Sequence, residues 1–221
     1  MSGDPMNASK VFMRHALKTL RPDDYFRIIN FGDTSHELTN SPIRATKQNL
    51  YRGQKHIDSL NANGGTEIVP AIKHAFSSPL IGRTLRIVIF LTDGYVSNES
   101  EVMQLINEKI KDARIYAFGV GTSVNRYLLS EMGRIGHGFA RYIDPTENSE
   151  EVAIKFARKL NSPLLTNISI DWNKLNVSEV TPEIIPDLFS GDSIRIQGKY
   201  EGAGLQTIRV LGKVQGREAS L

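Results

Sequence analysis

The triplet Thr92-Asp93-Gly94 is the first of two segments whose residue types and positions could perform chemistry. It follows an aliphatic run and precedes a helical pattern, so we expect Asp93 at the carboxyl end of a parallel strand. Open α/β sheets place their ligand sites at that edge. An Asp-Gly pair also forms ordinary turns, so the triplet alone leaves both interpretations open.

The second segment is Gly64-Gly65-Thr66, a glycine loop that ends where another helical pattern begins. A threonine at that position can cap the first backbone N–H groups of the helix. Alternatively, the loop presents the Thr66 hydroxyl to a hard cation beside the Asp93 carboxylate. Mg²⁺ prefers such oxygen ligands and retains several of its waters.

Alternating strand and helix patterns must position these two segments. Aliphatic runs at Leu85–Leu91, Arg114–Val120 and Phe139–Ile143 predict strands, the first of them buried on both faces. Another strand is predicted over Tyr25–Phe31. Helical patterns precede, separate and follow these runs; they begin near residues 5, 45, 66, 99, 125 and 149. The sequence therefore predicts an α/β fold with a doubly wound, mostly parallel, Rossmann-like sheet flanked by helices.

The pattern changes at Asn161-Ser162-Pro163, after which no helical pattern appears. Three or four segments alternate apolar and polar residues, as half-exposed antiparallel strands do. We therefore predict two domains, an α/β domain over residues 1–161 and a small β segment, partly like a β-sandwich, over residues 162–221.

Composition excludes several classes of function. The net charge of +3 gives no electrostatic indication of nucleic-acid binding, and a chain with no cysteine has neither disulfides nor thiolate chemistry. No apolar run approaches the length of a membrane-spanning helix. A dinucleotide-type loop starts at Gly119-Val120-Gly121 but has Val124 at its third glycine position.

The order and spacing of these segments resemble the von Willebrand factor type A domain. The family's metal-ion-dependent adhesion site consists of Asp-x-Ser-x-Ser after the first strand, a threonine in a later loop and an aspartate after the fourth strand. Gly-Gly-Thr66 matches the second element and Leu-Thr-Asp93-Gly94 the third. The resemblance implies Thr66 and Asp93 as metal ligands, Mg²⁺ as the cation, and a protein partner that supplies an Asp or Glu carboxylate. The tail, with Asp171-Trp172 and residues 186–191, is similar to the region that follows this domain in inter-alpha-trypsin inhibitor heavy chains.

The family's first strand and its Asp-x-Ser-x-Ser motif have no counterpart, because Met1-Ser2-Gly3 matches the segment directly after them. With only Thr66 and Asp93 as ligands, we expect Mg²⁺ to bind weakly or not at all. In the family the first strand lies between the strands predicted here at Tyr25–Phe31 and Leu85–Leu91. We expect that slot to be filled by a second copy in a strand-swapped homodimer, by the tail, or by direct pairing of the flanking strands, and we favour the dimer.

The leading functional hypothesis is a non-enzymatic protein-binding module. An alternative is a metal-dependent hydrolase built on Asp93, for which only Asp33 and Asp144 are candidate partners. A further alternative is a structural scaffold with a vestigial metal site. The resemblance implies an extracellular or cell-envelope setting.

Overall fold

The structure is a computed structural model that describes residues 3–31, 37–61, 68–82, 84–94, 98–111, 113–144, 146–160, 163–214 and 217–220. Its contacts divide the chain into two compact units, Met1–Ala157 and Arg158–Leu221. Each unit is described by itself. No helix in the described part of the chain is both long and apolar enough to cross a membrane.

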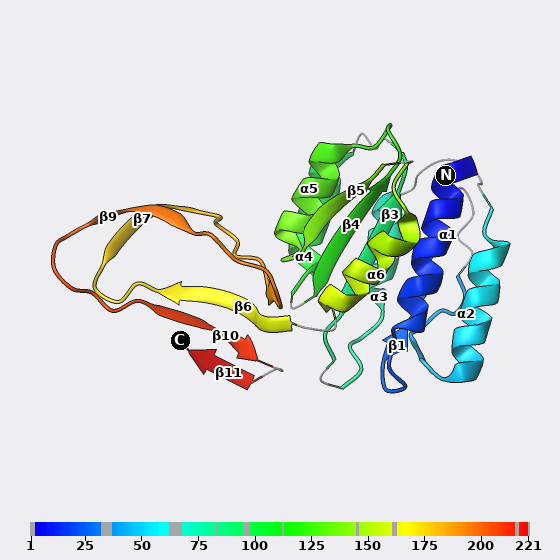
Figure 1. Cartoon of the computed structure of the whole chain (residues 1–221), viewed down its shortest axis with the longest axis horizontal. Coiled ribbons are helices and arrows are strands. Elements are labelled where there is room, and N and C mark those ends of the chain that lie inside the picture. The colour runs from blue at the N-terminus through cyan, green and yellow to red at the C-terminus, as the bar shows by residue number, and fades with distance from the viewer. Residues whose placement is uncertain are drawn as a thin grey trace. The chain divides into compact units, whose positions relative to one another are not determined.

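Unit 1 is built on a parallel sheet of β3 (Ile87–Thr92), β4 (Arg114–Val120) and β5 (Phe139–Ile143), in that order (Figure 1). The helices of the unit are α1 (Gly3–Lys18), α2 (Lys47–Ser59), α3 (Ile68–Ser77), α4 (Glu99–Lys109), α5 (Arg126–Ile135) and α6 (Ser149–Leu160). Helices α4 and α5 connect consecutive parallel strands. The predicted α/β class and flanking helices are therefore confirmed.

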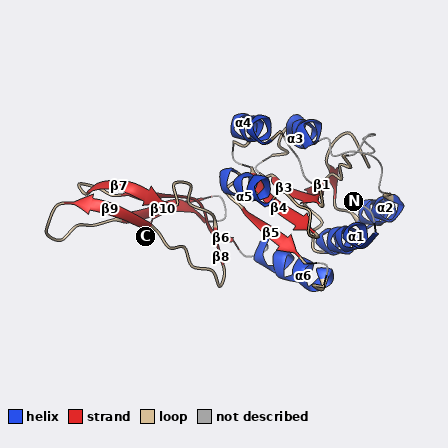
Figure 2. Cartoon of the chain, turned by 90° about the horizontal axis from the view of Figure 1, so that it is seen from above, coloured by secondary structure: helices blue, strands red, loops and turns tan. Residues whose placement is uncertain are grey.

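Strand β4 is the centre of this sheet, and all seven of its residues are buried. Ile115 and Ala117 face a cluster supplied by α3, α4 and α5. On the other face, the Phe118 ring lies 4.6 Å from Phe12 of α1 and 4.9 Å from Phe156 of α6, measured between ring centroids. Figure 2 shows the two layers of helices on either side of the sheet.

The expectation that the strand near Leu85–Leu91 is buried on both faces is wrong for its first half. Ile87 is exposed, and burial becomes complete only from Phe90 to Thr92. The physical reason is packing: β3 pairs with β4 along its whole length, but the sheet cluster covers Phe90 and, in part, Val88, and does not include Ile87.

A second, smaller part of unit 1 is formed by β1 (Tyr25–Phe26), β2 (Ile43–Arg44) and α2. β1 pairs with β2 in antiparallel fashion, and Ile29 forms an isolated bridge with Glu37. The strand predicted over Tyr25–Phe31 is thus much shorter than expected. Helix α2 is preceded by its N-cap residue Thr46, whose hydroxyl accepts a hydrogen bond from the Asn49 N–H.

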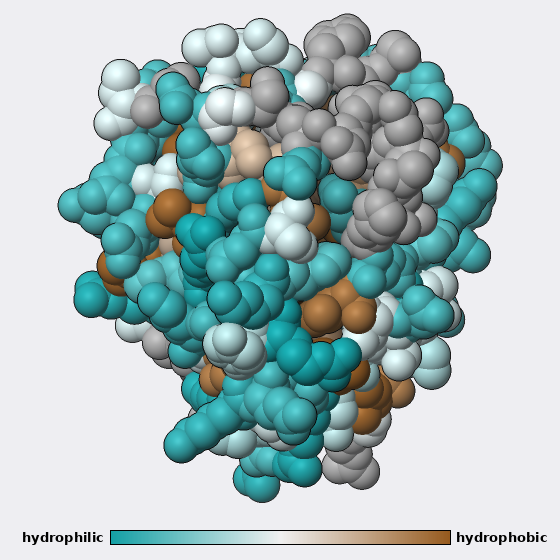
Figure 3. Space-filling view, turned by 90° about the vertical axis from the view of Figure 1, so that its right-hand side faces the viewer, coloured by the Kyte–Doolittle hydropathy of each residue, from teal (hydrophilic) through white to brown (hydrophobic). Residues whose placement is uncertain are grey.

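The amphipathic helices of this unit bury one stripe and expose the other. In α1 the buried positions are Ser9, Phe12 and Leu17, and in α2 they are Gly53 and Ile57. The face in Figure 3 is accordingly mainly hydrophilic, with small and separate hydrophobic groups.

Unit 2 begins within the last turn of α6, and its regular elements after that helix are strands in the described residues: β6 (Pro163–Asp171), β7 (Asn176–Thr181), β8 (Leu188–Phe189), β9 (Gln197–Glu201), β10 (Arg209–Val214) and β11 (Arg217–Ser220). The order in one sheet is β11-β10-β6-β8, and β7 pairs with β9 in a second sheet. All of these pairs are antiparallel, as the alternating sequence pattern predicts.

Candidate functional site

Asp93 lies directly beyond the last residue of β3, at the carboxyl edge of the parallel sheet. The strand that carries it is firmly placed there, because Phe90, Leu91 and Thr92 are buried. The Thr92 hydroxyl accepts a hydrogen bond from the Gly94 N–H at 3.2 Å, which fixes the turn after the strand. The half-buried Asp93 carboxylate is thus at the edge predicted from the sequence.

The ends of the two neighbouring strands complete this edge. Gly121 follows β4 with φ of +99°, a conformation that glycine adopts without strain, and its N–H donates to the Ile143 carbonyl at 3.1 Å. A Cβ atom at Gly121 would lie 3.6 Å from Cγ of Pro5, so the first turn of α1 is adjacent to the end of β4. Asp144 follows β5, and its carboxylate accepts two bonds from Thr146, from the backbone N–H and the hydroxyl. These bonds lower the pKa of Asp144.

A buried asparagine ties two helix starts together at the same edge. Asn125 caps α5 by accepting the Leu128 N–H at 3.0 Å, and its side-chain amide donates to a Glu99 carboxylate oxygen at 2.7 Å. Glu99 is the first residue of α4, the helix that follows the Asp93 turn. The sequence analysis did not identify this pair, although an Asn one residue before a helical pattern is a cap signal.

The other predicted ligand, Thr66, lies in the range 62–67, outside the described residues. Asp33 also lies outside them, in the range 32–36. Of the residues that the sequence suggests for this edge, the structure therefore describes Asp93 and Asp144. The described residues alone do not form a complete set of metal ligands. Among the described residues there is no group of three or more His, Cys, Asp or Glu side chains that could hold a metal ion.

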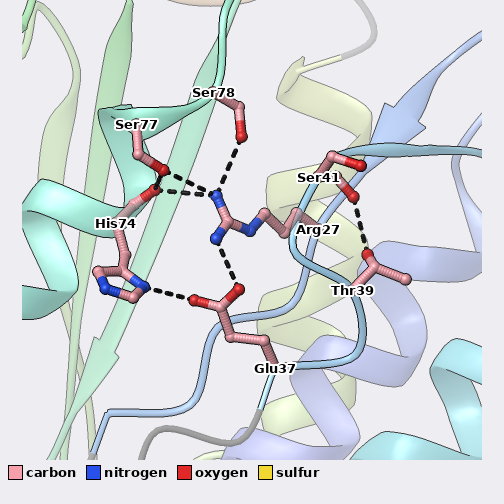
Figure 4. Close-up of polar contacts among 7 residues, drawn as sticks. All are labelled: Arg27, Glu37, Thr39, Ser41, His74, Ser77 and Ser78. Atoms are coloured by element: carbon pink, nitrogen blue, oxygen red, sulfur yellow. Dashed lines mark hydrogen bonds and ion pairs between the residues drawn. The ribbon is translucent and has the colours of Figure 1, made fainter.

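A second polar cluster, which the sequence analysis missed, joins the segment after β1 to the end of α3 (Figure 4). An Arg27 guanidinium N–H donates to the Glu37 carboxylate at 2.6 Å, and Nδ1 of His74 lies 2.6 Å from the other oxygen of that carboxylate. The other terminal nitrogen of Arg27 donates to the His74 carbonyl and to the hydroxyls of Ser77 and Ser78. We call Arg27, Glu37 and His74 the clasp.

The clasp is buried at its centre, because the Arg27 and Glu37 side chains are only 10% and 9% exposed. Burial by itself raises the pKa of Glu37, but the hydrogen bonds and positive charges of Arg27 and His74 outweigh burial and hold that pKa below its ordinary value of 4.5. Arg86 binds the same end of α3 by donating to the Phe76 and Ser78 carbonyls. Two guanidinium groups therefore satisfy carbonyls at the carboxyl end of α3, where backbone acceptors have no partner within the helix.

The flanking strands β1 and β3 do not pair with each other within the described chain. One edge of β3 pairs with β4, and no described strand pairs with its other edge. The Arg114 N–H donates to the Arg86 carbonyl. Because backbone groups alternate sides along a strand, those of Ile87, Ile89 and Leu91 face the other edge. Side chains span this interval instead: the ring of Phe31 stacks on Phe90 with 4.8 Å between centroids.

Comparison with known proteins identifies the family. The sequence profile of the von Willebrand factor type A domain matches residues 1–142. The chain belongs to this family, as the sequence predicted.

Relatives confirm the resemblance at modest identity. The chain is 27% identical over 197 residues to a von Willebrand factor A domain-containing protein of Dictyostelium discoideum, covering 89% of this chain and 21% of the relative. It is 29% identical to von Willebrand factor A domain-containing protein 5B1 of Homo sapiens, covering 88% of this chain and 16% of that protein. It is 25% identical to inter-alpha-trypsin inhibitor heavy chain H2 of Homo sapiens, covering 94% of this chain and 23% of that protein. The chain therefore spans about a fifth of the length of these relatives.

Solved structures share the fold. A von Willebrand factor type A protein from Catenulispora acidiphila superimposes with a TM-score of 0.72 at 18% identity, covering 97% of this chain and 59% of that one. The ArnB paralog VWA2 from Sulfolobus acidocaldarius superimposes with a TM-score of 0.60 at 16% identity, covering 97% and 58%. The similarity covers both units of the chain.

Proposed function

We propose that this protein is a non-enzymatic protein-binding or adhesion module. It binds an acidic group of a partner through a divalent cation held at the carboxyl edge of the sheet, with Thr66 and Asp93 as ligands and Mg²⁺ as the cation. The observation that carries the proposal is the placement of Asp93 directly after β3, beside the end of β4, in a chain of this family. A structural neighbour, the mussel proximal thread matrix protein 1, has been solved with zinc in this kind of motif (TM-score 0.52, 18% identity), which supports a divalent cation.

Asp93 fits the role of one oxygen ligand of a hard cation, and Thr66 would add a neutral hydroxyl. One carboxylate and one hydroxyl offset little of the cost of removing water from Mg²⁺. We therefore infer that these residues bind the metal weakly unless further ligands join them. Such a cation keeps positive charge, and that charge attracts the Asp or Glu carboxylate of a partner.

Calorimetry with Mg²⁺ tests the proposal on a chain that carries the family's Asp-x-Ser-x-Ser motif ahead of Met1. In the extended chain we expect binding at millimolar metal or below, and loss of binding in Asp93→Asn. In residues 1–221 alone we expect weak binding or none. Asp144→Asn is the matched control, because it removes a carboxylate at the same edge and is expected to retain binding. Absence of heat at millimolar Mg²⁺ in the extended chain would refute the proposal.

For the partner, we infer that an Asp or Glu side chain in a protein segment completes the coordination, and that neither nucleic acid nor a membrane-spanning segment of this chain is involved. Titration of the metal-loaded chain with an acidic peptide and its Asn or Gln counterpart tests this. Equal binding of the two peptides would exclude the carboxylate.

A strand-swapped homodimer remains our proposal for the edge of β3 that faces away from β4. The support is the set of backbone groups at Ile87, Ile89 and Leu91 that no described strand satisfies. Strand addition from a neighbouring copy is a general way to satisfy such an edge. Light scattering at micromolar concentration decides the matter, since a stable monomer excludes the swap.

We infer that Asp144 does not serve Asp93 as the general acid of a hydrolytic pair. Of the two candidate partners of Asp93, only Asp144 is described. Its carboxylate accepts two hydrogen bonds from Thr146 in a turn, and these lower its pKa, which disfavours a role as proton donor.

We place the protein in an extracellular or cell-envelope setting by its family; cell fractionation with a specific antibody tests this location.

A further inference from the structure

Among the described residues of unit 1, two hydrophobic clusters flank the clasp, apart from the buried rings of Phe12, Phe118 and Phe156 on the other face of the sheet. The sheet cluster is formed by α3, α4, α5 and the inner strands and includes Ile72, Phe90 and Ile115. The hairpin cluster is formed by Leu17, Phe26, Ala45 and Ile57, with Ile28 and Leu38 packed against it. Each cluster can therefore be monitored through its own segments, α2 for the hairpin cluster and β4 for the sheet cluster.

The clasp connects these two clusters. Arg27 stands between Phe26 and Ile28, and Glu37 precedes Leu38, so both belong to the chain of the hairpin cluster. Their partner His74 lies on α3, two residues after Ile72 of the sheet cluster. The Phe31–Phe90 ring stack and helix α1 also connect the two parts, but the ring stack contains no group that titrates.

The charges of the clasp make it dependent on the ionised form of Glu37. Arg27 from the segment after β1 and His74 from α3 contact the carboxylate. Burial, and after it the positive charge of nearby Arg27, lowers the pKa of Arg86, the residue that precedes β3. A carboxylate only accepts hydrogen bonds, so His74 Nδ1 is the donor while Glu37 is ionised. Protonation of Glu37 would leave two guanidinium groups and an imidazole close together without an anion.

The interior of the clasp cannot readily compensate for that loss. Nε of Arg27 is buried and has no hydrogen-bond partner among the described residues, so the guanidinium already lacks one bond. Breaking a buried ion pair leaves an uncompensated charge in a poorly solvated place. Release of the clasp is therefore favoured over retention of a neutral Glu37 within it.

We propose that the clasp is an acid-released joint between the hairpin cluster and the sheet cluster. While Glu37 is ionised, the hairpin cluster and the sheet cluster unfold in one event. When Glu37 is protonated or replaced, β1, β2 and α2 open locally without opening of the sheet. The sign follows from the depressed pKa of Glu37: the linkage is fully present above pH 4.5 and is lost as the pH falls through the lower value of the folded state.

Hydrogen exchange measured by mass spectrometry tests the joint. Protection factors, corrected for the intrinsic pH dependence of exchange, are followed in α2 and β4 of the whole chain from pH 7 to pH 3. We expect the ratio of protection in β4 to that in α2 to rise below pH 4.5, as Glu37 is protonated and the hairpin cluster opens on its own.

Two variants and one control separate the joint from general destabilisation. Glu37→Gln is expected to show the raised ratio already at pH 7, and His74→Gln a smaller rise. Asp58→Asn, which removes an exposed ion pair on α2, should leave the ratio as in the wild type. If Glu37→Gln does not fold, the wild-type pH series and His74→Gln still test the proposal. Loss of protection in α2 and β4 together at every pH, or a wild-type ratio in a folded Glu37→Gln at pH 7, would overturn the proposal.

Discussion

Two ion pairs in unit 1 have the same chemistry and the same length but different surroundings. In both, an arginine nitrogen lies 2.6 Å from a carboxylate oxygen: Arg27 with Glu37, and Arg14 of α1 with Asp58 of α2. The first pair is 10% and 9% exposed, whereas the second is 39% and 46% exposed. Their shortest N–O distance therefore does not distinguish them, and their burial does.

Burial changes what is lost when one partner is removed. At the exposed pair, water replaces the missing partner and salt screens the remaining charge, so such pairs contribute little. At the buried pair, the remaining guanidinium stays poorly solvated and unpaired, so removal of one partner is costly. The comparison predicts that two ion pairs with equal N–O distances contribute very different free energies to the stability of the fold.

The largest expected effect is that of Glu37→Ala. We expect the free energy of unfolding to fall by about 3–5 kcal/mol at pH 7, because Arg27 is left buried beside Arg86 without an anion. Urea unfolding followed by circular dichroism measures the change. A loss below 1 kcal/mol would show that Arg27 finds another partner and that burial does not decide the comparison.

The pH dependence of stability gives the next effect. Because the pKa of Glu37 is lowered in the folded state, its contribution is complete above pH 4.5 and disappears as the pH falls through the folded value. Wild-type stability should therefore fall with acid more steeply than that of Glu37→Gln. Parallel acid titrations of the two proteins check this, and equal slopes below pH 4.5 would contradict it.

The same contrast explains what could be predicted from the sequence. The position of Asp93 was predictable because a local pattern, an aliphatic strand followed by Thr-Asp-Gly, determines it. Helices with caps and one apolar stripe, such as α2 and α5, were predictable for the same reason. Glu37 was not, because its partners lie 10 and 37 residues away and only the folded chain brings them together.

Edges were the other feature that local patterns could not determine. An aliphatic run predicts a buried strand, and this is correct for β4, which has a strand on each side. It is wrong for the start of β3, because burial depends on the side chains that pack over the strand, and these are supplied by distant segments that the run itself does not specify. Strand β7 and the short strands β8 and β11 also escaped prediction; in β8 and β11, two to four residues carry too little periodicity.

A smaller effect is expected for His74→Gln. His74 is about half exposed, so water can partly replace its bond to the Glu37 carboxylate. We expect a loss of about 1 kcal/mol, the usual net contribution of one hydrogen bond, and not the larger cost of an unpaired buried charge. Urea unfolding at pH 7 measures it. A loss as large as that of Glu37→Ala would mean that His74, and not Arg27, dominates the clasp.

The smallest effect is expected for Asp58→Asn, which removes the exposed partner of the comparison. We expect the free energy of unfolding to change by less than about 1 kcal/mol, because Arg14 remains solvated and free to reorient. The change should shrink further when salt is raised to 1 M, where the screening length falls to about 3 Å. The loss in Glu37→Ala should persist at that salt concentration, because ions do not reach a pair that is nine-tenths buried. Unfolding of both variants at low and high salt, with guanidinium avoided as denaturant, measures the difference; a salt-independent loss in Asp58→Asn would show that α1 and α2 hold this pair more tightly than its exposure implies.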